Sequence, residues 1–288
     1  MSKFKTFFIP SVSQLSFPNQ MHPDFFSYGT VTIYLIYFTK QLLQIFNIQH
    51  LVFDSFIIGR FYSALFSTLT ILLAYKTTSI FLKKPWALAA ASLVALSPGL
   101  IQQAHFATPE SNLTFFLFGS LLFLLYFLQV GKVSHLLLSS VFLGLALGVK
   151  ISSLVFLVPL ITGVTLHSFK KPLRLVSLGS VSLILVIITF AIVAPYTFLD
   201  FPAFRSNLEY EGSLAIGRIP VFYTRQFIDT IPVLFQLEKI LPYALGPVLL
   251  LTGIIGFFTC LFSFLKKQKS ELLLFLVAFL SLFIPNAF

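Results

Sequence analysis

Long apolar runs, each about the length of a membrane-spanning helix, constrain this chain more than any other sequence feature. A helix needs about 20 mostly apolar residues to cross a hydrocarbon core about 30 Å thick, because each residue adds about 1.5 Å. A further run at 135–167 is too long for one span and is interrupted by Lys150, which predicts two short helices that meet in a turn. The chain is therefore expected to be an all-α, multi-pass membrane protein. The runs that predict spanning helices lie at 57–81, 85–104, 111–130, 173–195, 241–265 and 271–288.

The composition excludes several classes of protein. Apolar residues make up 57% of the chain and charged residues 10%, whereas a soluble domain has about 45–50% and about 25%. So few charges cannot cover a water-facing surface, which excludes a soluble globular enzyme, a nucleic-acid-binding domain and a disordered chain. Cys260 is the only cysteine and lies inside an apolar run, so neither a disulfide framework nor a thiolate metal site is expected.

The positions of the basic residues predict the orientation of the bundle in a cell membrane. Cytoplasmic loops carry an excess of lysine and arginine, so the basic connections are expected to face the cytoplasm. The alternation of loops holds if the weaker run at 30–46 lies in the interface as a juxtamembrane helix and Lys150 lies toward the outer side. The basic clusters occur at every second connection, at 83–84, 132, 170–174 and 266–269.

The chain is expected to form one transmembrane domain over residues 1–288, with two outer segments. Residues 1–56 form part of a first outer loop, and 196–240 form a long outer loop that holds five of the nine acidic residues. Loops this long usually carry function or are disordered, and the Tyr, Phe and Ile content of this one favours order against the membrane surface. Because Met1 opens on a polar segment, we expect a fragment that lacks its first helix and its C-terminal part. A complete short protein is the alternative.

The strongest candidate site is the segment 102–112, QQAHFATPESN, between two apolar runs on the outer side. Pro109 allows a new helix to start with Glu110 in its first turn, where the helix dipole favours an anion. A carboxylate beside the imidazole of His105 could bind a divalent metal or transfer a proton. The alternative is structural: Glu110 stabilises the start of the helix and His105 is hydrogen-bonded in a loop.

Lys150 is the second candidate, because an ionisable group between apolar runs is costly. Small residues precede it, which allows helices to approach closely at the break. Its ammonium could bind a phosphate as a point charge, or it could extend toward water from a helix end. Both interpretations stay open.

Arg60, Asp24, Tyr28 and Arg225 are weaker candidates. Arg60 starts a long helix on the outer side, where it could bind a lipid phosphate or anchor the helix end. Asp24 and Tyr28 are polar groups in the segment 21–30, MHPDFFSYGT, in which Asp24 could be a general base or a solvated acid. Arg225 in the long loop could bind an anionic group or pair with the acids of that loop. The chain has neither a P-loop nor a G-x-G-x-x-G motif, so no nucleotide-phosphate site is indicated.

Several short motifs occur in a fixed order between residues 59 and 125. They are Arg60 followed by the small residue Ala64, the basic turn LKKP, the helix end LSP and the outer loop ATPE that ends at Glu110. A later run, GLALGVKISSLVFLVP, and an earlier one, HPDFFSYGTVTIYL, complete the pattern. In this order the motifs resemble the membrane glycosyltransferases of the GT-C fold, which include protein O-mannosyltransferases, the aminoarabinose transferase of lipid A and bacterial family 39 relatives.

The resemblance implies a GT-C helical bundle with juxtamembrane helices on the outer face. It also implies transfer of a sugar from a polyprenyl-phosphate donor to a lipid, glycan or protein acceptor on the non-cytoplasmic side, with inversion at the anomeric carbon. By resemblance, Glu110 matches the second acidic position of the family and Lys150 its membrane-embedded lysine. The first acidic position of the family lies just after a first membrane helix that this sequence lacks, and Asp24 falls late for it.

Other functions remain open at this stage. A secondary transporter or lipid flippase would also contain broken helices and buried charges, although no inverted repeat is detectable. A catalytically inactive membrane fragment is a further alternative. Besides the donor and acceptor, the expected partners are membrane lipids and, for His105 and Glu110, a divalent metal cation.

Overall fold

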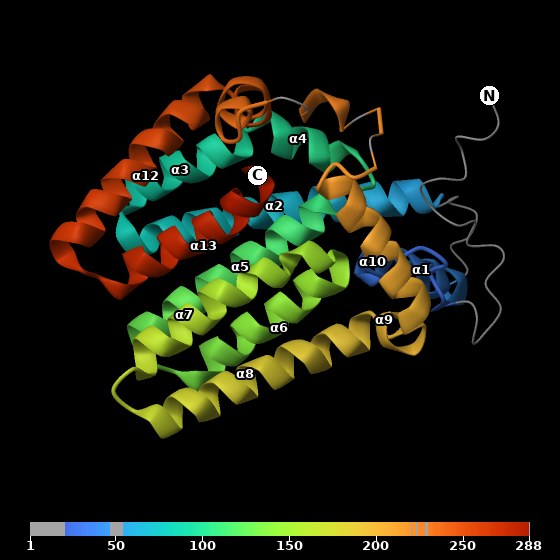
Figure 1. Cartoon of the computed structure of the whole chain (residues 1–288), viewed down its shortest axis with the longest axis horizontal. Helices are drawn as coiled ribbons and strands as arrows, with labels where there is room; N and C mark the ends of the chain where they lie inside the picture. Colours follow the sequence, from blue (N-terminus) through green and yellow to red (C-terminus); the bar gives the residue numbers. More distant parts are fainter. Residues whose placement is uncertain (1–20, 47–53, 220, 223, 228–229, 288) are drawn as a thin grey trace.

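The computed structural model describes residues 21–46, 54–219, 221–222, 224–227 and 230–287, and over these residues it is helical and contains no strand. Five segments are long and apolar enough to cross a membrane, and a sixth is a pair of helices bent by 56°. The five are Ser55–Phe81 (α2), Glu110–Val130 (α5), Ile151–Ser168, Pro172–Val193 (α8) and Pro247–Lys267 (α12), and the bent pair is Lys84–Ala95 (α3) with Pro98–His105 (α4). The chain is thus a multi-pass helical membrane protein (Figure 1).

The remaining helices are shorter. The long run at 135–167 folds as Val133–Val149 (α6), the 3-10 segment Ile151–Phe156 and Leu157–Ser168 (α7), while Ser270–Ala287 (α13) follows α12. Outside the bundle lie Val31–Ile45 (α1), Tyr196–Leu199 (α9) and Phe201–Ala215 (α10). Between α10 and α12 the described residues form a 3-10 turn at Arg225–Phe227, a π-helix at Gln236–Ile240 and Leu241–Leu245 (α11).

Three of the predicted spans differ in detail from the observed helices. The run at 271–288 folds as α13, which is among the shorter apolar helices and not among the candidate spans. The run at 85–104 is bent because Pro98 begins a new helix directly after the extended Ser97. The run at 241–265 is interrupted by Gly246, whose φ of 79° only glycine adopts without strain, so the long helix α12 begins at Pro247. The predicted turn at Lys150 is confirmed: its backbone is extended, at φ −155° and ψ 125°, and it ends α6.

The turns that carry the basic clusters gather at one end of the bundle. The α2–α3, α5–α6, α7–α8 and α12–α13 turns all lie at the left of Figure 1, and α1, α9 and α10 lie at the opposite end. We call this opposite end, with residues 21–30, 105–110 and Lys150 and the described residues of 194–219, 221–222, 224–227 and 230–246, the outer end, after the orientation that the basic clusters predict. The separation agrees with the alternation of basic and non-basic connections in the sequence.

Helix α5 lies at the centre of the packing. Leu124, Leu125 and Phe127 on this helix are fully buried, and the hydrophobic core continues onto α6, α7, α8 and α13. Gly119 allows α6 to approach closely, because a Cβ atom there would overlap the ring of Phe142. Since lipid is as apolar as these side chains, close packing of this kind holds membrane helices together.

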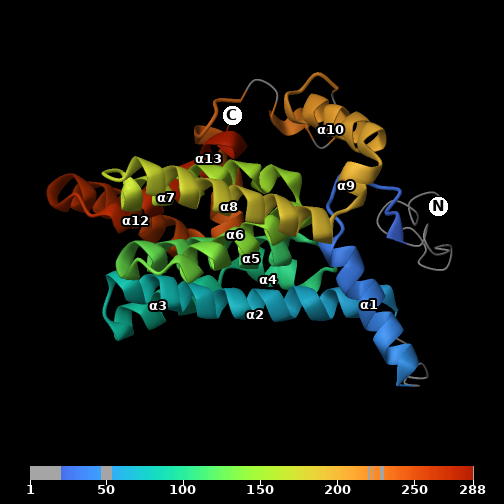
Figure 2. The same cartoon turned by 90° about the horizontal axis from the view of Figure 1, so that it is seen from below.

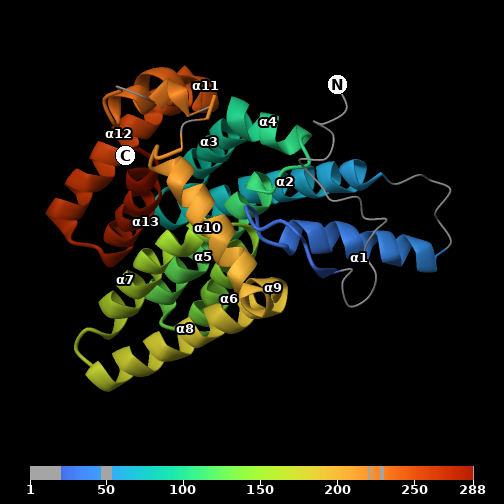
Figure 3. The same ribbon diagram turned by 45° about the vertical axis from the view of Figure 1, so that its right-hand side comes forward.

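Helix α1 leaves the bundle at the outer end. Figures 2 and 3 show that it extends away from the other helices. Its first turns bury Val31, Tyr34 and Ile36, whereas Leu42 and Ile45 near its C-terminus are exposed. With 15 residues it is too short to span a bilayer, in agreement with the prediction of a helix that lies in the interface.

The segment that precedes α1 docks on the helix break at Lys150. The backbone N–H of Gly29 donates to the carbonyl oxygen of Val149 at 2.8 Å, and the hydroxyl of Thr30 donates to the carbonyl of Val193 at the end of α8. A Cβ atom on Gly29 would overlap the carbonyl group of Gly148. Glycine is therefore required where this segment crosses the end of α6.

Substitution Gly29→Ala is expected to destabilise the protein by about 1–3 kcal/mol, because the added methyl group would push the segment at residue 29 away from the backbone of Gly148. Gly253→Ala on α12 is the matched control: nothing lies within 4 Å of its Cβ position, and alanine is the better helix former. Thermal unfolding in detergent should show a lower Tm for the first variant alone. Equal Tm values for the two variants would contradict the close contact.

Candidate functional site

Lys150 and Glu110 meet at the outer end of the bundle. The ammonium nitrogen of Lys150 lies 4.0 Å from Oε1 of Glu110, and both side chains are about one-third exposed, at 37% and 31%. The ammonium also lies over the ring of Tyr28, 5.3 Å from its centroid, in a cation–π contact. The fold thus brings together Tyr28, Glu110 and Lys150, which were each singled out from the sequence. The first and last of them are 122 positions apart.

The local sequence explains the position of each charge. Glu110 occupies the first turn of α5 directly after Pro109, as predicted, where the unpaired N–H groups and the helix dipole favour a carboxylate. Lys150 stands where α6 ends and a 3-10 segment begins. Its carbonyl oxygen accepts from both the backbone N–H and the hydroxyl of Ser153, which satisfies the backbone at the break.

A set of buried polar side chains fixes the first turn of α5. Asn112 is fully buried and donates to the hydroxyl of Thr32 on α1, and Ser111 accepts from Ser67 on α2. The hydroxyl of Ser63 donates to the carbonyl of Thr108. These contacts hold Glu110 at the junction of three helices. Hydrophobic periodicity does not reveal these contacts, because it does not show which distant side chains meet Ser111 and Asn112.

Asp24 lies in a second cluster of the segment 21–30. Its Oδ1 is 2.8 Å from Nδ1 of His22, and its side chain is 76% exposed. The other ring nitrogen of His22, Nε2, is 3.1 Å from Oδ2 of Asp200 at the start of α10. Sequence reasoning did not single out His22 or Asp200 as a pair, since 178 residues separate them.

Helix α10 binds the same segment through a further pair of contacts. The hydroxyl of Ser27 donates to Glu211 on α10 and accepts from the side-chain amide of Asn207 on the same helix. Figure 2 shows α10 lying outside the bundle, beyond α9, over the outer end. The start of the long loop at 196–240 thus folds as α9 and α10, and α10 contacts residues 21–30. That the loop lies against the membrane surface stays a prediction.

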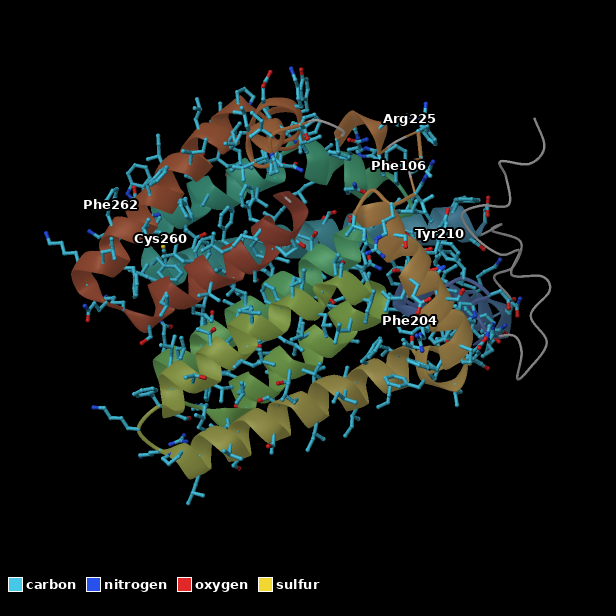
Figure 4. The ribbon with its side chains drawn as sticks, in the orientation of Figure 1. Phe106, Phe204, Tyr210, Arg225, Cys260 and Phe262 are labelled. Atoms are coloured by element: carbon cyan, nitrogen blue, oxygen red, sulfur yellow. The ribbon has the colours of Figure 1, made fainter. Side chains whose placement is uncertain are left out.

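The other predicted residues lie apart from these two clusters. Arg60 on α2 and Arg225 in the 3-10 turn are exposed, and neither forms an ion pair within the part of the chain that the structure describes. Figure 4 labels Arg225 at the outer end, away from Cys260 and Phe262 on α12. Nδ1 of His105 lies 2.7 Å from the carbonyl of Ile101 on its own helix, and the side chain is exposed.

The residues predicted to hold a metal do not form a complete ligand set. The carboxylate of Glu110 lies beside Lys150, whereas the recorded hydrogen bond of the His105 ring is to the carbonyl of Ile101. Among the described residues, no group of three or more His, Cys, Asp or Glu side chains could hold a metal ion. The metal therefore stays a prediction.

The two clusters supply complementary chemistry at one end of the bundle. A cation at a helix break can stabilise a phosphate that departs as an anion, and carboxylates at Glu110 and Asp24 can accept a proton from a hydroxyl group. Tyr28 belongs to the same short segment as Asp24, so residues 21–30 join the two clusters.

Tyr34 anchors this segment to α1. Its hydroxyl donates to the carbonyl oxygen of Met21 at 2.9 Å, and burial raises the pKa of Tyr34 to about 12. The unfolded chain, with a tyrosine pKa of about 10, loses this proton first. The stabilisation is therefore complete below pH 10 and is lost as the pH rises toward 12.

Substitution Tyr34→Phe is expected to cost about 1 kcal/mol at pH 7, because the Met21 carbonyl loses its donor. Between pH 10 and 12 the free energy of unfolding of the wild type should fall faster than that of the variant, by up to about 1.4 kcal/mol per pH unit. Denaturant unfolding of both proteins over this range measures the difference. Parallel pH profiles would contradict a buried, neutral phenol.

Comparison with known families assigns the chain. A family model described as dolichyl-phosphate-mannose-protein mannosyltransferase matches residues 33–196, which is more than half of the 288 residues and includes Glu110 and Lys150. A comparison with curated proteins found no match. The match confirms the resemblance noted in the sequence, and the chain belongs to the dolichyl-phosphate-mannose-protein mannosyltransferase family, a family of membrane glycosyltransferases of the GT-C type.

Proposed function

We propose that this protein transfers a sugar from a polyprenyl-phosphate carrier to an acceptor hydroxyl on the non-cytoplasmic side of the membrane. Mannose is the first candidate sugar because of the family description. The observation that carries the proposal is the contact of Lys150 with Glu110 and Tyr28 at a break between two membrane helices.

Lys150 has the properties of a phosphate-binding group. Its ammonium is fixed by the helix break and by the Tyr28 ring, and it remains partly accessible. The 4.0 Å separation from Glu110 exceeds a direct N–H···O hydrogen bond of about 2.7–3.2 Å. A phosphate oxygen of the donor can therefore take the ammonium without breaking a tight ion pair.

The carboxylates supply the other half of the reaction. The acceptor oxygen attacks the anomeric carbon while the bond from that carbon to the phosphate oxygen breaks, and the electron pair leaves on the phosphate. Lys150 stabilises the departing charge, and Glu110 or Asp24 receives the proton of the acceptor hydroxyl. A direct displacement of this kind inverts the anomeric centre.

The outer end of the bundle is the proposed active face. The basic turns lie at the opposite end, and basic loops favour the cytoplasmic side. Arg60 and Arg225 lie on the proposed active face, where they could bind the donor phosphate or an anionic acceptor. The acceptor is a lipid, glycan or protein, and α10 lies outside the bundle at this end.

Variants of the contacting pair test the proposal. Glu110→Gln and Lys150→Met should each lower the release of mannose from polyprenyl-phosphate mannose by about 10²–10³-fold, because each removes a charge that acts in the transition state. The matched controls are Glu238→Gln and Lys239→Met, an exposed pair at the same end with 2.7 Å between its charges. The assay uses purified protein in bilayers, with metal and chelator compared.

The outcomes of this assay distinguish the proposed transferase from a flippase and from an inactive fragment. Loss of turnover in the first two variants but not in the controls, with unchanged Tm, supports the assigned roles. Wild-type turnover in both would refute them. Donor movement across the bilayer without sugar release would indicate a flippase, and neither activity would indicate an inactive fragment.

The orientation is tested by labelling of single cysteines in a Cys260→Ser background. The two labelling variants are Ser206→Cys and Lys170→Cys. Ser206 is exposed on α10, and Lys170 is exposed in the α7–α8 turn. A membrane-impermeant maleimide should label the first in intact cells and the second only after permeabilisation. The reverse pattern would place the outer end in the cytoplasm and end the proposal.

A further inference from the structure

An apolar groove lies between α7 and α8, close to the turn that joins these two helices. The helices contact each other, and their turn lies at the basic end of the bundle (Figure 1). The groove has a cavity volume of about 60 Å³ and an almost entirely apolar lining, to which Leu160 and Val164 on α7 and Leu175 and Leu183 on α8 contribute. Between residues 175 and 183 it follows α8 for about 12 Å, since each helical residue adds about 1.5 Å. This shape suits a single extended hydrocarbon chain.

Gly179 on α8 keeps the groove open. It lines the groove, and within the described chain nothing lies within 4 Å of the position that its Cβ atom would take. Glycine is a poor helix former, and no close contact between helices requires it here, in contrast to Gly119 on α5. A larger side chain at residue 179 would therefore fill the groove without displacing a neighbour.

Three cations lie at the end of the groove where α7 turns into α8. Lys170 and Lys171 belong to the turn, and Arg174 lies in the first turn of α8, directly before Leu175 of the groove wall. All three side chains are exposed, and the ion pairs recorded in the described chain include none of them. Lys171 is also the N-cap residue of α8 and makes no side-chain cap hydrogen bond there. The first N–H groups of α8 thus add to the attraction for an anion.

The exposed side chains of this turn place it at the boundary between headgroups and hydrocarbon. Only residues 169–171 separate the two helices, and Phe169 and Leu173 are 76% and 88% exposed. Large apolar side chains gain from contact with lipid and lose from contact with water, whereas Lys and Arg at the end of a membrane helix reach toward the headgroups. The cations therefore lie at the depth of the lipid phosphates, and the groove lies at the depth of the acyl chains.

We propose that the α7–α8 turn and groove bind an anionic phospholipid, with its phosphate at Lys170, Lys171 and Arg174 and one acyl chain in the groove. A phospholipid carries both required parts, a negative group and an apolar chain, on one molecule. A free phosphate would match the cations but leave the groove empty, and a zwitterionic lipid brings an ammonium group that the cations repel. In the predicted orientation the site faces the cytoplasmic leaflet, which supplies anionic lipids. The inference does not depend on the proposed function, because the site lies at the end opposite Lys150 and Glu110.

A variant in which the three cations are neutralised together tests the phosphate contact. Native mass spectrometry of the purified full chain in a nonionic detergent counts bound lipid during titration with phosphatidylglycerol or phosphatidylcholine. The wild type should bind phosphatidylglycerol the more tightly. Combined Lys170→Gln, Lys171→Gln and Arg174→Gln should weaken phosphatidylglycerol binding by about 10²-fold, since each cation near a membrane phosphate contributes about fivefold. Phosphatidylcholine binding should stay unchanged.

The matched control removes the same number of exposed cations from another turn at the same end of the bundle. It should change phosphatidylglycerol binding by less than about twofold, because cations outside the site act only through a screened field. Equal loss in the two triple variants would show diffuse attraction to a basic surface and overturn the site. The control combines Lys266→Gln, Lys267→Gln and Lys269→Gln at the α12–α13 turn.

Gly179→Leu tests the groove, and Gly253→Leu on α12 is its control, because the Cβ position of Gly253 is equally open. Gly179→Leu should weaken phosphatidylglycerol binding at least tenfold with an unchanged Tm in lipid-free detergent, and Gly253→Leu should bind as the wild type does. Wild-type binding by Gly179→Leu would overturn the acyl-chain contact. Equal affinity of the wild type for the two lipids, or binding of inorganic phosphate as tight as that of phosphatidylglycerol, would overturn the proposal as a whole.

Discussion

A broken membrane helix must satisfy its backbone polar groups within the protein, and this constraint organises the outer end of the structure. Helix α6 stops at Val149, and the carbonyl groups of its last turn have no partner within the helix. In a membrane such groups cost several kcal/mol when they are unpaired. The N–H of Gly29 donates to the carbonyl of Val149, and the backbone N–H and the hydroxyl of Ser153 donate to the carbonyl of Lys150, the residue that follows the helix. The contact of Gly29 also brings segment 21–30 to Lys150.

The cost of charge in apolar surroundings shapes the candidate site in a similar way. Lys150 is placed beside a carboxylate and an aromatic ring, which stabilise an ammonium in a medium of low polarity. Glu110 is stabilised by the start of α5, and buried hydroxyl and amide groups on α1 and α2 hold that start in place. The candidate site therefore lies where a broken helix needs hydrogen-bond donors and where two charged side chains need stabilising contacts.

The long connection after α8 forms contacts with segment 21–30 outside the helical bundle. Asp200 begins α10 and contacts His22, and Ser27 contacts Glu211 on the same helix. These contacts are exposed or half-buried, so each is weaker than a buried one. Together they connect the segment before the first described helix to the segment after α8, with the Lys150 break beneath them.

The sequence alone determined the fold class, the helix break and the charge asymmetry, because apolar length, lone charges and basic turns are local properties that need no partner. It also identified Glu110, Lys150 and Tyr28 individually. It did not show that the three meet, or that Asp200 reaches His22, since contacts between residues 122 or 178 positions apart depend on how the helices pack. The sequence also did not predict the bend at Pro98 or the start of α12 at Pro247, because hydropathy is averaged over a window and is little changed by a single Gly or Pro residue. The tertiary structure decided these points, because close packing around α5 and the hydrogen bond between Gly29 and Val149 bring distant segments together.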